Sequence, residues 1–342
     1  MFFLDSIAMP AGLWWFEFLD RCLLKQIFEE FYMKGKALLM LFLLLAGCSV
    51  NDPSQEPVQT QLGIQTAAAL ATSGPEVANE LSARYRDTTT LRCDGLDSRP
   101  AFLCSGILLR GTATAAGFDV WDPSPTAERV GGTSFSFVRS DYKMKRLAMG
   151  YTKGLIFYPV LKTPSGKLKI EVLCFFPVDG DSDHRSDRGC GGISGYPSTV
   201  ACAAQGINTP EKWAENYNKH AASNHNRAGV CSFDVRDSAN TLGGPNFVKG
   251  MQAGRLVTPR AFDIPNDVKM ATWTKGQAKV LPIEAFFYVI VGNTSGLAEV
   301  RRDQLRFKEL TGETRPIIKV TMPTTLADKV TFAFQAQDQA VN

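Results

Sequence analysis

The chain contains 342 residues, of which 44% are hydrophobic, and its 37 basic and 34 acidic residues leave a net charge of +3. This length is ample for one large domain or two small ones with a real hydrophobic core. The nearly balanced charge, without a block of Lys and Arg interleaved with aromatic residues, does not favour a nucleic-acid partner. No fixed period typical of solenoid proteins is visible.

A bacterial lipoprotein signal is predicted inside the chain instead of at its start. Met33–Lys36 is a short basic segment, Ala37–Leu44 is unbroken apolar sequence, and Leu45–Cys48 reads Leu-Ala-Gly-Cys, the pattern of a lipobox. The apolar run, about a dozen residues long, is shorter than the roughly 20 that span a bilayer. We therefore expect cleavage before Cys48 and attachment of a lipid to that residue.

This signal divides the chain into parts. Residues 1–32 are interpreted as an extension from a start codon assigned too far upstream, and residues 33–47 as the signal peptide. Residues 48–74 are polar and lack strong periodicity, which suits a solvated tether. Residues 75–342 then form a single globular domain.

The residue after the lipidated cysteine indicates the compartment. In the lipoproteins that this signal resembles, a residue other than Asp at that position usually means delivery to the outer membrane, and here the residue is Ser49. We therefore expect the mature domain in the periplasm, on the cell surface or outside the cell, with outer-membrane lipid as a partner through Cys48.

The cysteine count indicates disulfides. Of the eight cysteines, Cys22 belongs to the extension and Cys48 to the lipid, so six remain. An even number in an oxidising compartment predicts three disulfides. Cys93 and Cys104 bracket a short loop that contains a proline, and their pairing is the favoured one. The absence of C-x-x-C spacing disfavours a zinc site. The pairing stays open for Cys174, Cys190, Cys202 and Cys231.

The expected elements describe a β-rich α+β domain. A helix begins with Pro75 in its first turn, a second helix covers Pro210–Ala222 with Thr209 as its cap, and the charged residues 301–309 suit a helix surface. A Cys-, Gly- and Asp-rich insertion covers about 179–245. Runs rich in β-branched and aromatic residues predict strands at Phe102–Leu109, Thr133–Val138, Leu155–Val160, Lys167–Phe176, Ile283–Val291, Pro316–Met322 and Lys329–Phe334.

The first segment with a side chain suited to binding or catalysis is an apolar strand that ends in Arg110. A guanidinium stays charged at any biological pH, so its emergence from a buried strand is costly unless an anion meets it. Its fork geometry suits a pyrophosphate. The alternative is a structural salt bridge to an aspartate such as Asp94 or Asp119.

The second segment is Gly131–Val138, in which hydroxyl and aromatic side chains alternate. Strand geometry directs Ser134 and Ser136 to one face and Phe135 and Phe137 to the other. Two hydroxyls on one face suit a ribose or a carboxylate, and an aromatic nearby suits a planar base. Ordinary strand alternation explains the same pattern.

The third segment is Leu281–Val289, an apolar strand interrupted by one carboxylate, that of Glu284. Burial of that charge without a partner would cost several kcal/mol or more, so the group must be paired, protonated or used. Glu284 is the predicted catalytic residue.

Three features follow one another along the chain: an Arg at the end of one strand, hydroxyls on the next strand and a lone Glu on a later strand. Their order resembles the Arg-Ser-Glu triad of bacterial ADP-ribosylating toxins. Four further segments are distinctive: Arg99–Gly106, Trp121–Pro125, Gly154–Pro159 and Leu281–Tyr288. Through them, the span from Cys93 to the C-terminus is also similar to the halovibrin-type secreted proteins. The resemblance implies an α+β fold with a β-rich ADP-ribosyltransferase-like core and a long disulfide-bearing insertion.

The same resemblance implies NAD as the substrate, without a further cofactor, and cleavage of the nicotinamide–ribose bond by a glycohydrolase or an ADP-ribosyltransferase. Glu284 would stabilise the oxocarbenium-like transition state and Arg110 would clamp the pyrophosphate. Ser134 or Ser136 would position Glu284 or the ribose. Trp121, or an aromatic of the second strand such as Phe135 or Phe137, would cover the nicotinamide.

Two departures from the toxin pattern matter. Toxins that modify arginine usually carry a second acidic residue two positions before the catalytic Glu, and here that residue is Pro282. Water is therefore favoured over a host or competitor protein as the acceptor. The long separation between Ser136 and Glu284 also requires the insertion to loop out without displacing the strands.

Other interpretations compete with catalysis. A non-catalytic, disulfide-stapled binding module of the cell surface would present the many Gly-, Ser- and Asn-bearing loops to a glycan or protein. Calcium is a weaker prediction than a solvated loop for Asp179, Asp181, Asp183 and Asp187, which lack the EF-hand glutamate. Neither a zinc-protease motif nor a hydrolase elbow is present around the histidines His184, His220 and His225 or around Ser105 and Ser194.

Overall fold

A computed structural model describes residues 73–88, 105–113, 118–158, 170–193, 201–221, 230–236 and 243–341. All of them belong to one unit that spans 59–342. The predicted signal peptide, the lipidation site Cys48 and the favoured pair Cys93 and Cys104 lie outside the described residues. Within the described ranges, no helix combines the length and the apolar character needed to cross a membrane.

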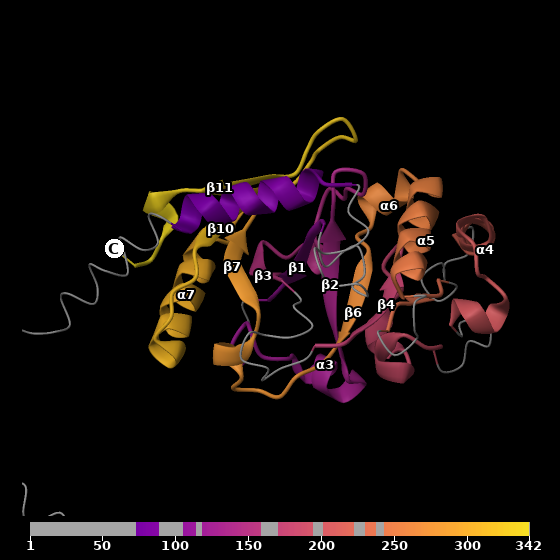
Figure 1. The fold of residues 1–342 in the computed structure, drawn as a ribbon, viewed down its shortest axis with the longest axis horizontal. Coiled ribbons are helices and arrows are strands. Elements are labelled where there is room, and N and C mark those ends of the chain that lie inside the picture. The colour runs from indigo at the N-terminus through magenta and orange to yellow at the C-terminus, as the bar shows by residue number, and fades with distance from the viewer. Residues whose placement is uncertain are drawn as a thin grey trace, which may run out of the picture. The chain divides into compact units, whose positions relative to one another are not determined.

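A large mixed sheet is the centre of the fold (Figure 1). Its order is β11-β10-β7-β3-β1-β2-β6-β4-β5, and every neighbouring pair is antiparallel except β7 and β10. The small hairpin β8 (Ile290–Val291) and β9 (Thr294–Ser295) follows β7. The sheet strands are β1 Ile107–Gly111, β2 Gly132–Val138, β3 Lys153–Phe157, β4 Val172–Phe176, β5 Phe233–Asp234, β6 Asp267–Ala271, β7 Ile283–Tyr288, β10 Ile317–Thr321 and β11 Thr331–Phe334.

Helices lie on both faces of this sheet and at one end of it. The helices are 73–86, α3 Pro125–Val130, α4 Pro210–Ala221, α5 Gly243–Leu256, α6 Arg260–Asp263 and α7 Leu297–Thr311. Short 3-10 turns cover Ala148–Gly150, Ser182–His184, Asp187–Gly189, Cys202–Gln205, Ala278–Val280 and Ala336–Asp338. Helix α7 connects the parallel strands β7 and β10, which need such a crossover.

One face of the sheet carries an aromatic core. Trp121 contacts Phe286 and Phe307 of α7 edge to face, with ring centroids 6.4 and 5.3 Å apart. Phe137 similarly contacts Phe247 of α5 at 5.0 Å. On the other face, helix 73–86 contributes Leu81, Ala78 and Tyr85 to a second buried cluster, and its indigo ribbon runs beside β10 and β11 (Figure 1).

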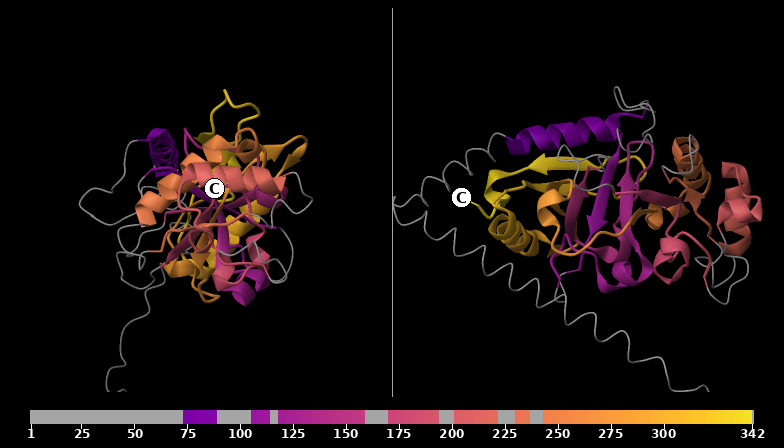
Figure 2. Two further views of the ribbon diagram at one scale, coloured as in Figure 1. Left: turned by 90° about the vertical axis from the view of Figure 1, so that its right-hand side faces the viewer. Right: turned by 60° about the horizontal axis from the view of Figure 1, so that its bottom comes forward.

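The predicted disulfide-bearing insertion lies at the β4–β5 end of the sheet, while α7 lies at the β10–β11 end (Figure 2). Two disulfides join Cys174 to Cys190 and Cys202 to Cys231. The insertion contains α4, where Trp213 stacks on Tyr217 at 5.3 Å, and this end has its own buried cluster. The α+β class is therefore confirmed, as are two of the three predicted disulfides.

The helix predictions are accurate where sequence signals are strong. Helix α4 begins at Pro210 as predicted, and Thr209 Oγ1 accepts a hydrogen bond from the backbone of Lys212 at 3.3 Å. The first helix begins at residue 73, two residues before Pro75. Helix α5 was not predicted because it is rich in glycine, yet a Cβ at Gly250 would lie 2.3 Å from the Phe175 ring. Glycine there lets the helix approach the sheet closely.

Candidate functional site

Glu284 does not lie in the predicted site. Its Oε2 accepts a hydrogen bond of 2.5 Å from Nη2 of Arg84 in helix 73–86, and its side chain is only 12% exposed. Burial raises the pKa of Glu284, while the charge and hydrogen bond of Arg84 oppose that shift. The carboxylate of Glu284 is therefore paired in an ion pair, which is one of the outcomes expected for a lone acid in an apolar strand, and is not held in a catalytic site.

Arg110 points to the opposite face of the sheet. Its guanidinium donates to the carbonyl oxygens of Val120 at 3.0 Å and Asp122 at 2.6 Å, and it lies 5.2 Å from the ring centroid of Trp273. Desolvation lowers the pKa of Arg110 to about 10. The guanidinium fixes the loop before α3, so it clamps backbone carbonyls rather than a pyrophosphate.

The predicted triad is consequently not assembled. Strands β3 and β1 separate β7, which carries Glu284, from β2, which carries Ser134 and Ser136. Because neighbouring strands are about 4.8 Å apart, about 14 Å of sheet lies between them. The prediction that Glu284 and Arg110 line one cleft is wrong. The salt bridge considered for Arg110 is also absent at Asp119, which pairs with Arg306 at 3.5 Å, while Asp94 lies outside the described residues.

The aromatic residues predicted to cover a nicotinamide lie in the core. Trp121, Phe135 and Phe137 are each at most 2% exposed and belong to the cluster beneath α7 and α5. The alternation along β2 is as predicted, since the phenylalanines face that core and the serines face the other side. None of these three rings is available to a ligand.

Ser134 and Ser136 instead line a cleft of about 200 Å³. Strands β1, β2 and β6 contribute Leu109, both serines and Asp267 to its lining. Residues 179–183 add an acidic segment, and Phe118 and Tyr151 add aromatic surface. The cleft therefore combines hydroxyls, carboxylates and rings, which the sequence had assigned to a site around Glu284.

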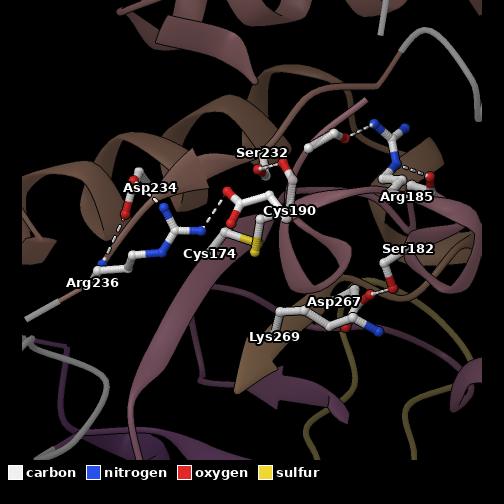
Figure 3. The surroundings of a disulfide bond; sticks show 12 residues. Cys174, Ser182, Arg185, Cys190, Ser232, Asp234, Arg236, Asp267 and Lys269 are labelled. Carbon is white, nitrogen blue, oxygen red and sulfur yellow. Dashed lines mark hydrogen bonds and ion pairs between the residues drawn. A yellow bond between two sulfur atoms is a disulfide. The ribbon is translucent and has the colours of Figure 1, made fainter. Parts of the chain in front are cut away.

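Asp267 is the buried acid among the four aspartates of this cleft. Asp267 is 5% exposed, and its Oδ2 accepts a hydrogen bond from the hydroxyl of Ser182 (Figure 3). The same oxygen accepts a second hydrogen bond, of 3.3 Å, from the hydroxyl of Ser134. Its Oδ1 is buried and has no hydrogen-bond partner within the described part of the chain. Burial raises the pKa of Asp267 to about 6, although the charge of Lys269 opposes the shift. An oxygen in this state requires a donor.

Lys269 completes the network from the same strand. Its side chain is fully buried, and its Nζ donates to Ser134 Oγ at 2.7 Å and to Asp183 Oδ1 at 3.2 Å. Val268 lies between Asp267 and Lys269 in the sequence, and Met270 follows Lys269. Both apolar side chains enter the core on the opposite face of the sheet. Strand alternation thus directs Asp267 and Lys269 to the cleft side together.

The acidic segment is anchored on both sides of residue 182. Arg185 donates to the carbonyl oxygens of Gly180, Gly191 and Val230 at 2.7, 3.0 and 2.6 Å, and Cys190 is bonded to Cys174 of β4 (Figure 3). These contacts hold residues 179–193 against β4 and β6. Ser182 is therefore presented to Asp267 by a cross-linked loop.

The acidic residues do not converge as ligands of one ion. Asp183 pairs with Lys269, and Asp187 pairs with Arg236 at 2.5 Å. Asp181 contacts the exposed His184 at 3.1 Å. No group of three or more His, Cys, Asp or Glu residues in the described ranges is arranged to hold a metal ion.

No protein-family model matches the chain, and no curated protein is significantly similar to it. The assignment of the functional site therefore depends on the geometry of the structure. Sequence reasoning missed Asp267, Lys269 and Ser182. A signal for β6 was present in the alternation Asp-Val-Lys-Met-Ala, but it lacks the aromatic and β-branched run used to predict the other strands.

Proposed function

We propose that the chain is an ADP-ribosyltransferase-like enzyme that hydrolyses NAD at the nicotinamide–ribose bond, with Asp267 in the role predicted for Glu284. The observation that carries the proposal is a buried carboxylate with one unpartnered oxygen, beside two serine hydroxyls in a cleft. Strand β6 of Asp267 neighbours β2 of the serines, so the carboxylate and the hydroxyls lie side by side. Arg110 takes no part in this site, because its guanidinium is bonded to the carbonyl oxygens of Val120 and Asp122.

The chemistry requires few groups. The nicotinamide leaves as a neutral molecule and takes the electron pair of the C1′–N bond, so no general acid is needed. An ionised Asp267 stabilises the positive charge that develops on the ribose, as a carboxylate does in glycoside hydrolysis. Water then adds to C1′ and loses a proton, which gives nicotinamide, ADP-ribose and H⁺.

The dimensions of the cleft suit one end of the dinucleotide. About 200 Å³ is below the roughly 300 Å³ of a pocket that encloses a drug-sized ligand. The nicotinamide riboside portion would occupy it, with the ring against Phe118 or Tyr151. The adenosine portion would lie outside.

The test is nicotinamide release from NAD by the full chain with its disulfides intact. Asp267→Asn is expected to reduce kcat by about 100-fold or more, because the carboxylate acts on the developing charge. Glu284→Gln is the matched control and is expected to keep wild-type kcat. Unimpaired turnover by Asp267→Asn would refute the assignment. Binding of a surface ligand without any turnover would favour the alternative binding module.

We also propose that the domain is held at the outer membrane through Cys48. The two disulfides are compatible with an oxidising compartment. Labelling of bacteria with a radioactive fatty acid should mark the wild-type chain and leave Cys48→Ser unlabelled. Equal labelling of both would exclude this anchor.

A further inference from the structure

The cleft around Asp267 carries an excess of negative charge. Four of its lining residues are aspartates, namely Asp179, Asp181, Asp183 and Asp267. Arg110 is the one basic residue in the described lining, and its guanidinium is used by the carbonyl oxygens of Val120 and Asp122. Nζ of Lys269 is bonded to Ser134 and Asp183. The described lining therefore offers no unused cation to a phosphate.

A second observation indicates what the cleft requires. Asp267 is 5% exposed, and its Oδ1 has no hydrogen-bond partner in the described ranges. Buried carboxylate oxygens need a donor or a positive charge. A ribose hydroxyl supplies a donor, and a pyridinium ring supplies a positive charge, whereas a phosphate supplies neither and is repelled by the aspartates.

We infer that the cleft recognises a phosphate-free, positively charged N-riboside, of which nicotinamide riboside is the simplest member. This inference rests on the proposed function and narrows it. Asp179, Asp181 and Asp183 attract the cationic ring, and Asp267 contacts the ribose. During bond cleavage the positive charge moves from the ring nitrogen to C1′, so the acidic surroundings stabilise the charge at both positions. The diphosphate of NAD is tolerated outside and adds no affinity.

The first experiment compares nicotinamide release from nicotinamide riboside, nicotinamide mononucleotide and NAD by the full chain. We expect kcat/KM to fall in that order, with at least about a tenfold difference between the first and the last. A preference for NAD, or inhibition by ADP-ribose stronger than by ribose, would overturn the inference while leaving NAD hydrolysis intact. Release from none of the three would overturn the proposed function.

A binding experiment tests the inference independently of turnover. Nicotinamide and 1-methylnicotinamide share a ring and differ chiefly in charge. Calorimetric titration is expected to show at least about tenfold tighter binding of the cationic compound. Equal affinities would refute selection for positive charge, whether or not the chain cleaves any riboside.

Variants locate the effect in the acidic segment. Asp181 adopts a left-handed backbone conformation with φ 56°, which asparagine tolerates well. Asp181→Asn is therefore expected to fold normally and to raise KM for nicotinamide riboside about threefold or more. Glu309→Gln on exposed α7 removes the same charge outside the cleft and should leave KM unchanged. An unchanged KM in Asp181→Asn would contradict the role of this aspartate.

Discussion

Nζ of Lys269 donates a 2.7 Å hydrogen bond to the hydroxyl oxygen of Ser134. That contact occupies a lone pair of the hydroxyl, so the hydroxyl proton is free to point to Asp267 Oδ2 at 3.3 Å. The three side chains come from neighbouring strands β2 and β6. Lys269 therefore sets both the orientation of the hydroxyl and the charge beside the carboxylate.

Replacement of Lys269 by methionine should shift the pH dependence of catalysis. The charge of Lys269 lowers the pKa of Asp267, so its loss raises that pKa above about 6. The acid limb of the kcat/KM profile is expected to move to higher pH, with reduced activity at pH 7. Lys212→Met on the exposed face of α4 serves as the control. An unmoved acid limb in Lys269→Met would show that Lys269 does not act on the catalytic group.

Asp267→Asn should make the protein more stable as it loses activity. Burial raises the pKa of Asp267 from its ordinary value of 3.8 to about 6, so the folded state binds the proton more tightly than the unfolded state. Ionised Asp267 therefore destabilises the fold above pH 6 by about 3 kcal/mol, and the penalty fades as the pH falls toward 4. The advantage of Asp267→Asn over wild type should be greater at pH 8 than at pH 4.5.

Urea unfolding at those two pH values measures this difference. Comparison across pH cancels the pH-independent cost of replacing the carboxyl group by an amide, whereas the hydrogen bonds from Ser134 and Ser182 to the ionised carboxylate are part of the pH-dependent difference. A constant stability difference between variant and wild type would contradict a raised pKa for Asp267.

The Arg84–Glu284 pair should support folding without affecting catalysis. Both side chains are about nine-tenths buried, at 10% and 12% exposure. Glu284→Ala leaves the Arg84 charge buried without its partner and should cost about 3 to 5 kcal/mol. The double variant Arg84→Met with Glu284→Leu removes both charges and should recover much of that loss. Urea unfolding measures the cost, and kcat should stay at the wild-type value in each variant that folds.

The sequence predicted local features well because their causes are local. The alternation in β2 separates Ser134 from Phe135, and proline and threonine set the start of α4. The partner of Glu284 was not predictable in this way, because Arg84 lies 200 residues earlier in the chain. A lone acid in an apolar strand indicates that a partner exists, but only the topology identifies it. The choice of Asp267 over Glu284 similarly depends on the position of β6 beside β2.

The two disulfides should differ in their effect on the site. Their cysteines are separated by 16 and 29 residues, so loop-closure entropy predicts a similar stabilisation of about 3 to 4 kcal/mol for each. Of the two disulfides, only Cys174–Cys190 links the loop that carries Ser182 and Asp183 covalently to β4. Replacement of this pair by alanines should therefore lower kcat/KM about tenfold or more in the fraction that remains folded.

The pair Cys202 and Cys231 provides the matched control, since it cross-links the region around α4 and β5 and none of its residues lines the cleft. Its replacement by alanines should lower the melting temperature by a similar amount and leave kcat/KM near the wild-type value at a temperature where both variants are folded. Parallel thermal melts and nicotinamide-release assays measure the two effects. If both variants lost activity equally, Cys174–Cys190 would act on overall stability alone. A local role predicts instead that the two variants have similar melting temperatures and different kcat/KM values.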